Sequence, residues 1–524
     1  MHGGPGSHSH TYAKSSTYIR DASAGSKDQA TMASPASAAA AAAHCQGLQG
    51  GEILPHVAIF PLMAKGHTIP LLDLACLLRR RGLAAVTLLT TPGNAPFVRA
   101  ALLACGGAGG DAVAVVELAF PAGHAPAGGE GAEGVASASA FAAFAEATSL
   151  LRHRLEEALA AMRPAPGLLV ADGFMYWAHA SAAALGVPSV SFLGTSAFAH
   201  VVREACVRDM PGADEGDDGP TTAGTYYTVP EFPHLHFSLA DLVLPPLTLM
   251  ELDAKMAAAV AASHGVIMNT FHDLEGRYIE HWNRNVGPRA WPIGPLCLAR
   301  KSCSSDHDRD RRPPWMLWLD DKAAAGRDVL YISLGTLAVI PEVQLKQVAD
   351  GLDRARVDFL WVLRPNNVDL GMGFEERVEG RGMVVREWVD QREILRHSCV
   401  RGFLSHCGWN SVLESVVAGV PLAAWPIEFE QPLNAKLVVD ELGIGVRVHS
   451  NDGTLGGLVK SEEITRVVGQ LMSREEGTVM ASNAKKLAAH AQIAMSEGGS
   501  SWKAVEEMME LCAVTTIAGK TMDV

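Results

Sequence analysis

The hydrophobic positions of this chain fall into short apolar runs that alternate with stretches of helical periodicity. The first run, HVAIFPLM at 56–63, is rich in β-forming residues. LLDLACLLRRRG at 71–82 carries apolar residues at helical spacing and ends in three arginines and a glycine. LAAVTLLTTP at 83–92 is typical of the next strand. Strand, loop, helix and strand in this order indicate a βαβ unit of a parallel sheet.

The same alternation continues through the first half of the chain. The pattern predicts further strands at 111–120, 167–174, 188–196 and 264–271. It predicts helices at 149–162, 177–187 and 272–283. Residues 121–140 and 211–225 are expected to be loops. A mixture of proline, serine and charged residues at 291–315 predicts a linker.

A second alternating series follows this linker. It predicts strands at 328–336, 358–364, 382–389, 399–406 and 421–426. It predicts helices at 342–355, 393–398, 411–419, 477–496 and 500–513. Two doubly wound α/β halves with a cleft between them are expected, with ligands at the carboxyl ends of the strands. We expect a leader at 1–50, an N-terminal domain at 51–297, a linker at 298–313, a C-terminal domain at 314–498, and a last helix and tail at 499–524 that pack back on the N-terminal domain.

Composition limits the class of protein. The chain has 524 residues, of which 48% are hydrophobic and 19% charged, so two globular domains of roughly 100–200 residues each are expected. The formal net charge of −14 repels phosphate backbones and argues against a nucleic-acid partner. The nine cysteines form no CxxC pair, which favours reduced thiols in the cytosol. The chain contains no run of about 18 apolar residues, so no membrane span is predicted.

The first 50 residues differ from the rest. They are rich in Ser, Ala, Gly and His and contain no hydrophobic segment of the signal-peptide kind. We expect a disordered, low-complexity leader. Met32 is expected to be the working start, because an ordinary short leader separates it from the first strand.

The stretch from 388 to 431 carries the clearest chemistry. It runs strand, HCGWNS, helix, and Gly408 permits a tight turn with close backbone approach. Asn410 and Ser411 are good N-cap residues for the helix that follows. A helix N-terminus offers free N–H groups and a positive dipole end, which suit a diphosphate. His406, at the strand end, is expected to reach a phosphate oxygen.

Other side chains of this stretch suit a nucleotide and a sugar. Glu414, one turn into the helix, offers a carboxylate to both hydroxyls of a ribose, and Trp388 offers a flat face to a base. Glu430 and Gln431 follow the next strand on the same rim of the sheet, with hydrogen-bonding groups for sugar hydroxyls. Alone, Trp388 is typical of a core residue and Glu414 of a solvated helix face. Their joint occurrence at fixed spacing favours a binding site.

This stretch resembles the signature box of plant family-one UDP-dependent glycosyltransferases and has its expected length of 44 residues. The order of elements also agrees over about residues 55–515. The resemblance implies a GT-B fold, which is α/β with two Rossmann-like parallel-sheet domains facing across a cleft. The N-terminal domain would bind an acceptor and the C-terminal domain a UDP-sugar.

The resemblance also implies roles for individual residues. Trp388 would stack on uracil near Gln391, Trp409 would pack near the sugar, and Thr336 would touch the nucleotide. A glutamine at the last box position is associated with glucose donors. The full set of implied donor-site residues is Thr336, Trp388, Gln391, His406, Trp409, Asn410, Ser411, Glu414, Glu430 and Gln431.

Candidate catalytic groups lie in the other half. His67 is expected in the loop after the first strand, where an imidazole can take a proton from a hydroxyl. Asp172 ends an apolar strand of the same domain and is expected to orient that ring, although an aspartate at such a junction more often caps a helix. The family resemblance implies that the two form a catalytic dyad. A family hydroxyl that touches the sugar aligns here with Gly194 or Thr195, so this contact departs from the family pattern.

These patterns lead to one principal hypothesis. An inverting UDP-glycosyltransferase would transfer a hexose, expected to be glucose, to a hydroxyl of a small lipophilic acceptor such as a flavonoid, phenolic or hormone. UDP-sugar is then a co-substrate, no metal or other cofactor is expected, and the protein is expected to be a cytoplasmic monomer. Acceptor contacts are expected from loops at about 121–146, 194–210 and 226–250.

Two alternatives remain. A catalytically silent UDP-sugar-binding protein would need neither His67 nor Asp172. A nicotinamide-dependent oxidoreductase is less favoured because the glycine fingerprint of a dinucleotide site is missing. DHDRD at 306–310 contains a DxD pattern, but it lies in the charged linker and not at the end of an apolar strand.

Overall fold

The structure is a computed structural model of the chain. It describes residues 54–512 apart from 106–112, 125, 127–128, 136, 210–225, 239–240, 243–246, 301–311, 336–339 and 364–369. The predicted leader, the expected start at Met32, the DHDRD segment and Thr336 lie outside the described residues.

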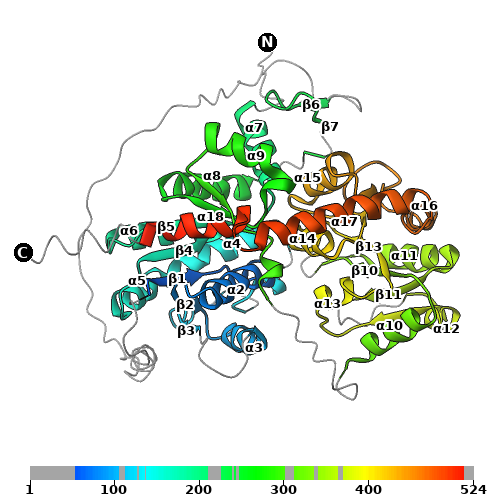
Figure 1. The fold of residues 1–524 in the computed structure, drawn as a ribbon, viewed down its shortest axis with the longest axis horizontal. Coiled ribbons are helices and arrows are strands. Elements are labelled where there is room, and N and C mark those ends of the chain that lie inside the picture. Colours follow the sequence, from blue (N-terminus) through cyan, green and yellow to red (C-terminus); the bar gives the residue numbers. More distant parts are fainter. Residues whose placement is uncertain are drawn as a thin grey trace, which may run out of the picture.

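The N-terminal half is built on a seven-stranded parallel sheet with the order β3-β2-β1-β4-β5-β8-β9 (Figure 1). Reversal of the strand order beside β1 is the mark of a doubly wound sheet, in which ligands bind beyond the carboxyl ends of the strands. The strands are β1 (His56–Phe60), β2 (Ala85–Thr90), β3 (Ala114–Glu117), β4 (Leu168–Asp172), β5 (Ser189–Leu193), β8 (Val266–Met268) and β9 (Ala290–Pro292).

Helices surround this sheet, and a short antiparallel hairpin stands apart from it. The helices are α2 (Lys65–Arg80), α3 (Ala95–Cys105), α4 (Ala138–Ala147), α5 (Arg152–Ala161), α6 (Ala178–Ala184), α7 (Ala197–Asp209), α8 (Leu247–Ala262) and α9 (His272–Asn285). The hairpin consists of β6 (Tyr226–Thr228) and β7 (His236–Ser238).

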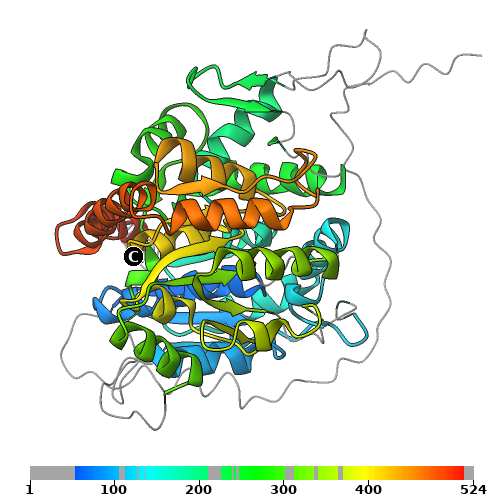
Figure 2. The same cartoon turned by 90° about the vertical axis from the view of Figure 1, so that its right-hand side faces the viewer.

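The C-terminal half repeats the plan with a six-stranded parallel sheet in the order β12-β11-β10-β13-β14-β15. Figure 2 shows this half turned toward the viewer. Its strands are β10 (Val329–Ser333), β11 (Asp358–Val362), β12 (Gly382–Val385), β13 (Val400–Ser405), β14 (Leu422–Ala424) and β15 (Gly445–Arg447). Its helices are α10 (Pro314–Ala324), α11 (Glu342–Ala355), α12 (Phe374–Arg377), α13 (Gln391–Leu395), α14 (Trp409–Ala418), α15 (Gln431–Lys436), α16 (Ser461–Leu471) and α17 (Glu476–Met495).

Several elements differ from the sequence prediction. Helix α2 begins at Lys65, six residues before the predicted start, and runs through Pro70. The predicted linker at 291–315 begins too early, because β9 still belongs to the first sheet. Its Pro292 is tolerated there because β9 is an edge strand, which needs fewer backbone donors. Helices α3, α7, α8, α10, α12, α15 and α16, strands β9 and β15, and the hairpin were not predicted.

The predicted loop at 121–140 also contains helical structure. A short 3₁₀ turn covers Ala132–Gly134, and α4 begins within the predicted loop. The Ser137 hydroxyl accepts a hydrogen bond from the backbone N–H of Ala140 at 3.2 Å, which caps α4. Phe141 and Phe144, three residues apart, are both buried. Local capping and burial of one aromatic face therefore form a helix in an alanine-rich stretch.

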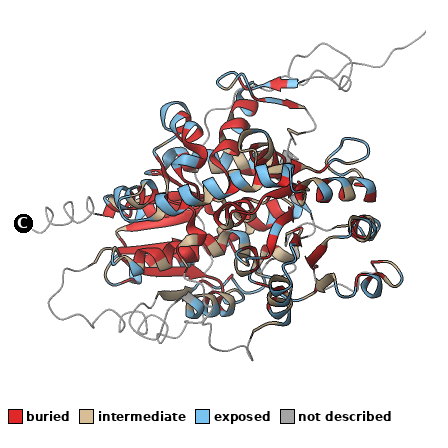
Figure 3. Ribbon diagram, turned by 45° about the vertical axis from the view of Figure 1, so that its right-hand side comes forward, coloured by how far each residue is buried: buried red, intermediate tan, exposed pale blue. Residues whose placement is uncertain are grey.

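Burial follows the layers. Figure 3 shows the inner strands of both sheets buried, while the helices carry exposed residues on their outer sides. The edge strands β3 and β12 are mostly of intermediate burial. One apolar cluster also crosses between the halves and includes Phe271 of the first half and Trp409 of the second. The two halves are therefore packed together by apolar contact.

The last helix, α18 (Ser500–Met509), returns to the N-terminal half, as Figure 1 shows in red. Val505 and Met508 are buried in the same apolar cluster as the strands of the first sheet. The Ser501 hydroxyl donates to the Gly294 carbonyl at 2.5 Å, and the Arg81 guanidinium lies 3.4 Å from the Trp502 ring centroid. Helix α18 is thus part of the N-terminal core.

Met508→Ala is expected to lower the free energy of unfolding by about 2–5 kcal/mol, because it removes a fully buried side chain and leaves a cavity. Chemical denaturation followed by circular dichroism measures the change. Lys503→Ala, on the exposed face of the same helix, is the matched control and is expected to change stability by less than about 0.5 kcal/mol. Equal effects of the two substitutions would show that α18 does not hold the core.

Candidate active site

His67 and Asp172 meet at the rim of the first sheet. Strands β1 and β4 are parallel neighbours, so the residues that follow β1 and end β4 emerge at the same edge. The His67 Nδ1 lies 2.8 Å from the Asp172 Oδ2, a hydrogen-bonded ion pair when the imidazole is protonated. His67 lies in the first turn of α2, so its predicted place in a loop is wrong. The helix holds the imidazole more rigidly than a loop.

The Asp172 side chain is only 1% exposed, and each of its two carboxylate oxygens has a hydrogen-bonding partner. Oδ2 contacts His67, and Oδ1 accepts a hydrogen bond from the backbone N–H of Phe174 at 3.1 Å. That second bond caps the short 3₁₀ turn Gly173–Met175. The helix-cap interpretation and the histidine-partner interpretation of this aspartate therefore both hold.

The surroundings of His67 act on its charge in opposite directions. Burial lowers the pKa of His67, whereas the negative charge and hydrogen bond of Asp172 raise it, with smaller contributions from Glu430 and Glu133. The net effect raises the pKa of His67 above its usual value of 6.5. With Nδ1 held by Asp172, Nε2 is the ring nitrogen that can take a proton from another group.

Two neighbours fix the plane of this imidazole. The Phe174 ring meets it edge-on at a centroid distance of 5.5 Å. On another side lies Gly194, where a Cβ atom would come within 3.3 Å of His67 Cε1 and Nδ1. A larger residue at 194 would press on the ring. Gly194, one of the two residues that align with the family hydroxyl position, therefore lies directly against His67.

The donor-box residues Gln391, Ser411 and Glu414 lie together between α13 and α14. The Gln391 Nε2 donates to the Glu414 Oε2 at 2.8 Å and to the Ser411 Oγ at 3.0 Å. The Tyr331 hydroxyl donates to the Gln391 Oε1 at 3.3 Å. Burial raises the pKa of Glu414 to about 7, while the Gln391 hydrogen bond and the Arg392 charge hold it down. The Gln391 amide, held by Tyr331 and Ser411, therefore orients the carboxyl group of Glu414.

The turn before α14 differs from the prediction in its N-cap residue. The left-handed residue is Cys407, with φ of 63°, whereas Gly408 has φ of −58° and is itself the N-cap. Asn410 and Ser411 lie in the first helical turn and are not the cap. Gly408 is required for space: a Cβ there would lie 2.5 Å from His406 Nε2, and one on Gly335 would lie 2.7 Å from the same atom. Two glycines therefore make room for the His406 ring.

Glu430 and Gln431 stand at the start of α15, which follows β14. The Gln431 Oε1 accepts backbone hydrogen bonds from Ile427 at 2.9 Å and Glu428 at 3.0 Å, which leaves its NH₂ group as a donor. Burial raises the pKa of Glu430, and the charge of His67 in the other half is among the influences that lower it. Glu430, at the predicted hexose end of the donor site, therefore lies close enough to His67 of the other half for their charges to interact.

The two tryptophans of the box lie in different surroundings. Trp388 is 56% exposed, and the Lys65 Nζ lies 4.3 Å from its ring centroid. Trp409 is 2% exposed, and its Nε1 donates to the Asn269 carbonyl at 2.9 Å. Trp388 offers an accessible ring face, whereas Trp409 packs at the junction of the two halves.

A buried polar contact that the sequence did not predict joins the halves. The Ser196 hydroxyl donates to the Asn434 Oδ1 at 2.7 Å, and the Asn434 Nδ2 donates to the Cys407 carbonyl at 3.0 Å. Ser196 and Asn434 are both fully buried. The only sequence signal is a polar residue, Asn434, one turn after Gln431 in an otherwise apolar stretch, which does not reveal a partner 238 residues away.

An aromatic wall, formed by Phe141, Phe174 and Phe429, lies beside the imidazole. Phe141 meets Phe174 edge-on at 5.1 Å and lies 5.9 Å from Phe429 of the other half. Phe429 has φ of 56°, a conformation that is rare for a bulky residue and is concentrated at functional sites. The wall therefore places apolar, aromatic side chains next to His67.

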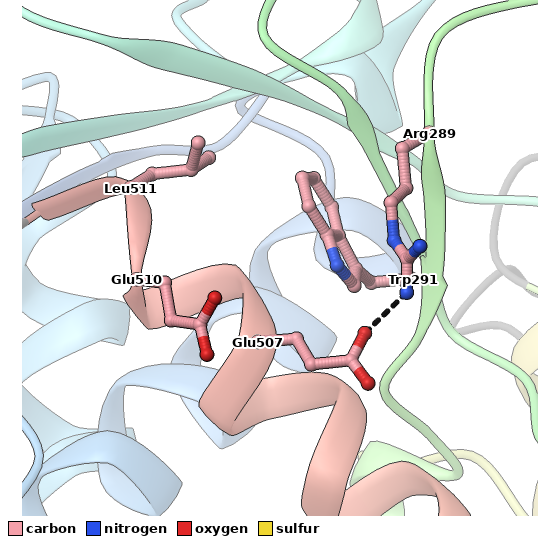
Figure 4. Close-up of a pocket in the computed structure, with 5 residues that line it drawn as sticks. All are labelled: Arg289, Trp291, Glu507, Glu510 and Leu511. Carbon is pink, nitrogen blue, oxygen red and sulfur yellow. Dashed lines mark hydrogen bonds and ion pairs between the residues drawn. The ribbon is translucent and has the colours of Figure 1, made fainter. Parts of the chain in front are cut away.

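A separate cavity of about 440 Å³ opens between β9 and α18, as Figure 4 shows. The Arg289 and Glu507 side chains form an ion pair across it. Its lining residues are Arg289, Trp291, Glu507, Glu510 and Leu511. None of them belongs to the residues described above, so this cavity is not part of the candidate active site.

Two further observations concern metals and membranes. Within the described ranges, no group of three or more His, Cys, Asp or Glu residues is arranged to hold a metal ion. No helix of the described part of the chain has the length and apolar character needed to cross a membrane.

Comparison with known proteins gives the class. The family described as UDP-glucuronosyl and UDP-glucosyl transferase matches residues 307–465. UDP-glycosyltransferase 90A1 of Arabidopsis thaliana is 38% identical over 474 residues, which cover 87% of this chain and 96% of that protein. UDP-glucose flavonoid 3-O-glucosyltransferase 7 of Fragaria ananassa is 33% identical, over 85% of this chain and 94% of its own length.

Solved structures agree. The crystal structure of UGT73P12 of Glycyrrhiza uralensis, complexed with glycyrrhetinic acid 3-O-monoglucuronide, superimposes with a TM-score of 0.76 at 27% identity. The match covers 90% of this chain and 98% of that one. The two parallel-sheet halves define a glycosyltransferase of the GT-B fold class, which confirms the predicted fold. The chain belongs to the plant UDP-glycosyltransferase family.

Asp172→Asn is expected to lower the pKa of His67, because the burial that lowers it remains while the largest influence that raises it is removed. Titration of the imidazole by NMR from pH 5 to 9 measures the shift. His56, in the same sheet and bonded to the Pro164 carbonyl and Thr87, is the internal control and is expected to titrate unchanged. An unchanged His67 titration would contradict the electrostatic coupling.

Proposed function

We propose that this protein is an inverting UDP-glycosyltransferase that transfers a hexose, with glucose preferred, to a hydroxyl of a small lipophilic acceptor. The observation that carries the proposal is the His67–Asp172 pair, with His67 electrostatically coupled to Glu430 of the donor box. A general base on one domain and a sugar-binding carboxylate on the other are what direct transfer between two substrates requires.

The proposed reaction is a single displacement. The acceptor oxygen attacks the anomeric carbon from the face opposite UDP while His67 Nε2 takes the hydroxyl proton. The new carbon–oxygen bond forms as the bond to the UDP oxygen breaks, and UDP leaves with that electron pair. An α-linked donor thus yields a β-glycoside. Asp172 stabilises the imidazolium, in keeping with the raised pKa of His67.

The donor-box residues have distinct proposed roles. Glu414, held by Gln391, accepts the ribose hydroxyls, and Trp388 stacks on uracil. The NH₂ group of Gln431 is available to a hexose hydroxyl because its carbonyl oxygen is already occupied. The remaining residues of the proposed donor site are Thr336, His406, Trp409, Asn410, Ser411 and Glu430.

We propose that no metal takes part. The diphosphate would lie at the N-terminus of α14, where free N–H groups and the helix dipole favour negative charge. His406 would provide a further hydrogen bond to the leaving phosphate.

The acceptor is proposed to be a flat, hydroxylated aromatic compound. The aromatic wall beside His67 favours stacking with such a molecule. Relatives named for such acceptors include the Fragaria flavonoid 3-O-glucosyltransferase, an anthocyanin 3'-O-beta-glucosyltransferase of Gentiana triflora and a scopoletin glucosyltransferase of Nicotiana tabacum.

Three further expectations remain proposals. The protein is proposed to act in the cytoplasm as a monomer. The acceptor domain is proposed to span 51–297 and the donor domain 314–498, with 298–313 between them. A silent UDP-sugar-binding protein is less favoured, because the hydrogen-bonded His67–Asp172 pair has no use in binding alone.

The test of function is a UDP-release assay with UDP-glucose, UDP-galactose, UDP-xylose and UDP-glucuronate against phenolic, flavonoid and hormone acceptors, with products identified by mass spectrometry. His67→Ala is expected to reduce turnover by about 100-fold or more, because the general base is lost. Binding of UDP-glucose, measured by calorimetry, is expected to persist. His236→Ala, on the separate hairpin, is the matched control. Near-normal turnover by His67→Ala would contradict the mechanism.

Phe141→Ala is expected to raise the KM for a flavonoid acceptor by about tenfold, because removal of one aromatic pair costs about 0.5–1.5 kcal/mol beyond lost contact area. The KM for UDP-glucose is expected to stay within about twofold. Phe144→Ala, on the same helix, is the control for a general loss of packing. If both KM values rise together, the wall does not form the acceptor surface.

A further inference from the structure

Helix α2 has an unusual feature next to the catalytic candidate. Among the helices that the structure describes, it alone carries a proline beyond the first turn, Pro70. In an α-helix the N–H of residue i donates to the carbonyl of residue i−4. Proline has no N–H, and its ring pushes that carbonyl aside. The carbonyl affected by Pro70 is that of Gly66, the residue immediately before His67.

The Gly66 carbonyl is bonded from the other half of the molecule instead. The Asn410 Nδ2 donates to it at 2.5 Å. Asn410 is the second residue of α14, inside the donor box. An asparagine amide has two N–H donors, so one can bond Gly66 while the other remains for an acceptor at the N-terminus of α14. That is where the diphosphate is proposed to lie.

The neighbours of Gly66 face the donor box as well. The Lys65 Nζ lies over the Trp388 ring at 4.3 Å, and the His67 charge influences the pKa of Glu430. Three consecutive residues of one helical turn are therefore coupled to the parts of the box proposed to hold the base, the diphosphate and the sugar. The bond from Asn410 is the central and only directional contact of the three.

We infer that Pro70 is a positioning residue for the transfer reaction. It keeps the Gly66 carbonyl out of the α2 hydrogen-bond ladder, so that Asn410 can bond it. This bond fixes the first turn of α2, and with it His67, against the donor box. It also orients Asn410 toward the diphosphate. The inference rests on the proposed function, because it assigns the donor to the N-terminus of α14.

A purely structural role for Pro70 makes a different prediction. Proline in a helix interior is disfavoured relative to alanine, because it removes one backbone hydrogen bond and distorts the helix. If Pro70 had no role in ligand binding, replacing it with alanine would preserve or raise stability and leave ligand binding unchanged. Stability and binding must therefore be measured together.

Pro70→Ala restores an N–H that competes with Asn410 for the Gly66 carbonyl. We expect the Tm of the full chain to stay equal or rise. The Kd for UDP, measured by titration calorimetry, is expected to rise about threefold to tenfold, the effect of one lost hydrogen bond. The kcat/KM for UDP-glucose is expected to fall by at least the same factor. Pro314→Ala, at the exposed first position of α10 where no N–H is needed, is the matched control and is expected to change neither quantity.

A double-mutant cycle with Asn410→Ala separates this coupling from a general disturbance. If Pro70 acts through Asn410, the double variant is expected to bind UDP no more weakly than Asn410→Ala alone. Additive losses, or wild-type UDP affinity in Pro70→Ala, would overturn the inference. A wild-type protein that binds UDP but transfers no sugar would overturn the proposed function, while the UDP titrations would still decide the role of Pro70.

Discussion

The buried carboxylate of Asp172 is the constraint on which the candidate active site depends. A carboxylate removed from water is costly unless its oxygens are hydrogen-bonded. Here one oxygen holds the backbone of Phe174 and the other holds the imidazole of His67. The same side chain therefore terminates β4, starts the next turn and orients the proposed base. Because β1 and β4 are parallel neighbours, no long loop is needed to bring the two residues together.

The two halves must also keep a fixed position relative to each other. The groups proposed to act on acceptor and donor lie on different sheets, and reacting groups must be held within a fraction of an ångström. Apolar packing alone is not directional. Buried hydrogen bonds from Trp409 to Asn269 and from Ser196 to Asn434 supply direction, since an unpaired buried polar group would be costly. The chain also crosses back through α18, which ties its end to the first sheet.

Where the sequence prediction is wrong, the local structure involves contacts between side chains and backbone that the local sequence pattern does not reveal. Asn410 and Ser411 are the predicted N-cap residues of α14, but Gly408 takes that position, and its lack of a side chain leaves space for His406. The apolar pattern predicts a helix only from residue 71 and places His67 in a loop. The helix in fact begins at Lys65, and the Gly66 carbonyl, which Pro70 deprives of its helical donor, accepts a hydrogen bond from Asn410.

The sequence by itself determined the two alternating α/β halves and the meeting of His67 with Asp172. These follow from periodicity and from the rule that parallel strands present their ends at one edge. The residues proposed to hold the donor follow from the resemblance of 388–431 to the family signature box. Only the tertiary structure decided the burial of Trp409, the contact of Phe141 with Phe429, and the Ser196–Asn434 bond. Each joins residues that are far apart in the chain and on different halves. No local pattern records such a pair, because the pair exists only once both sheets have folded and packed against each other.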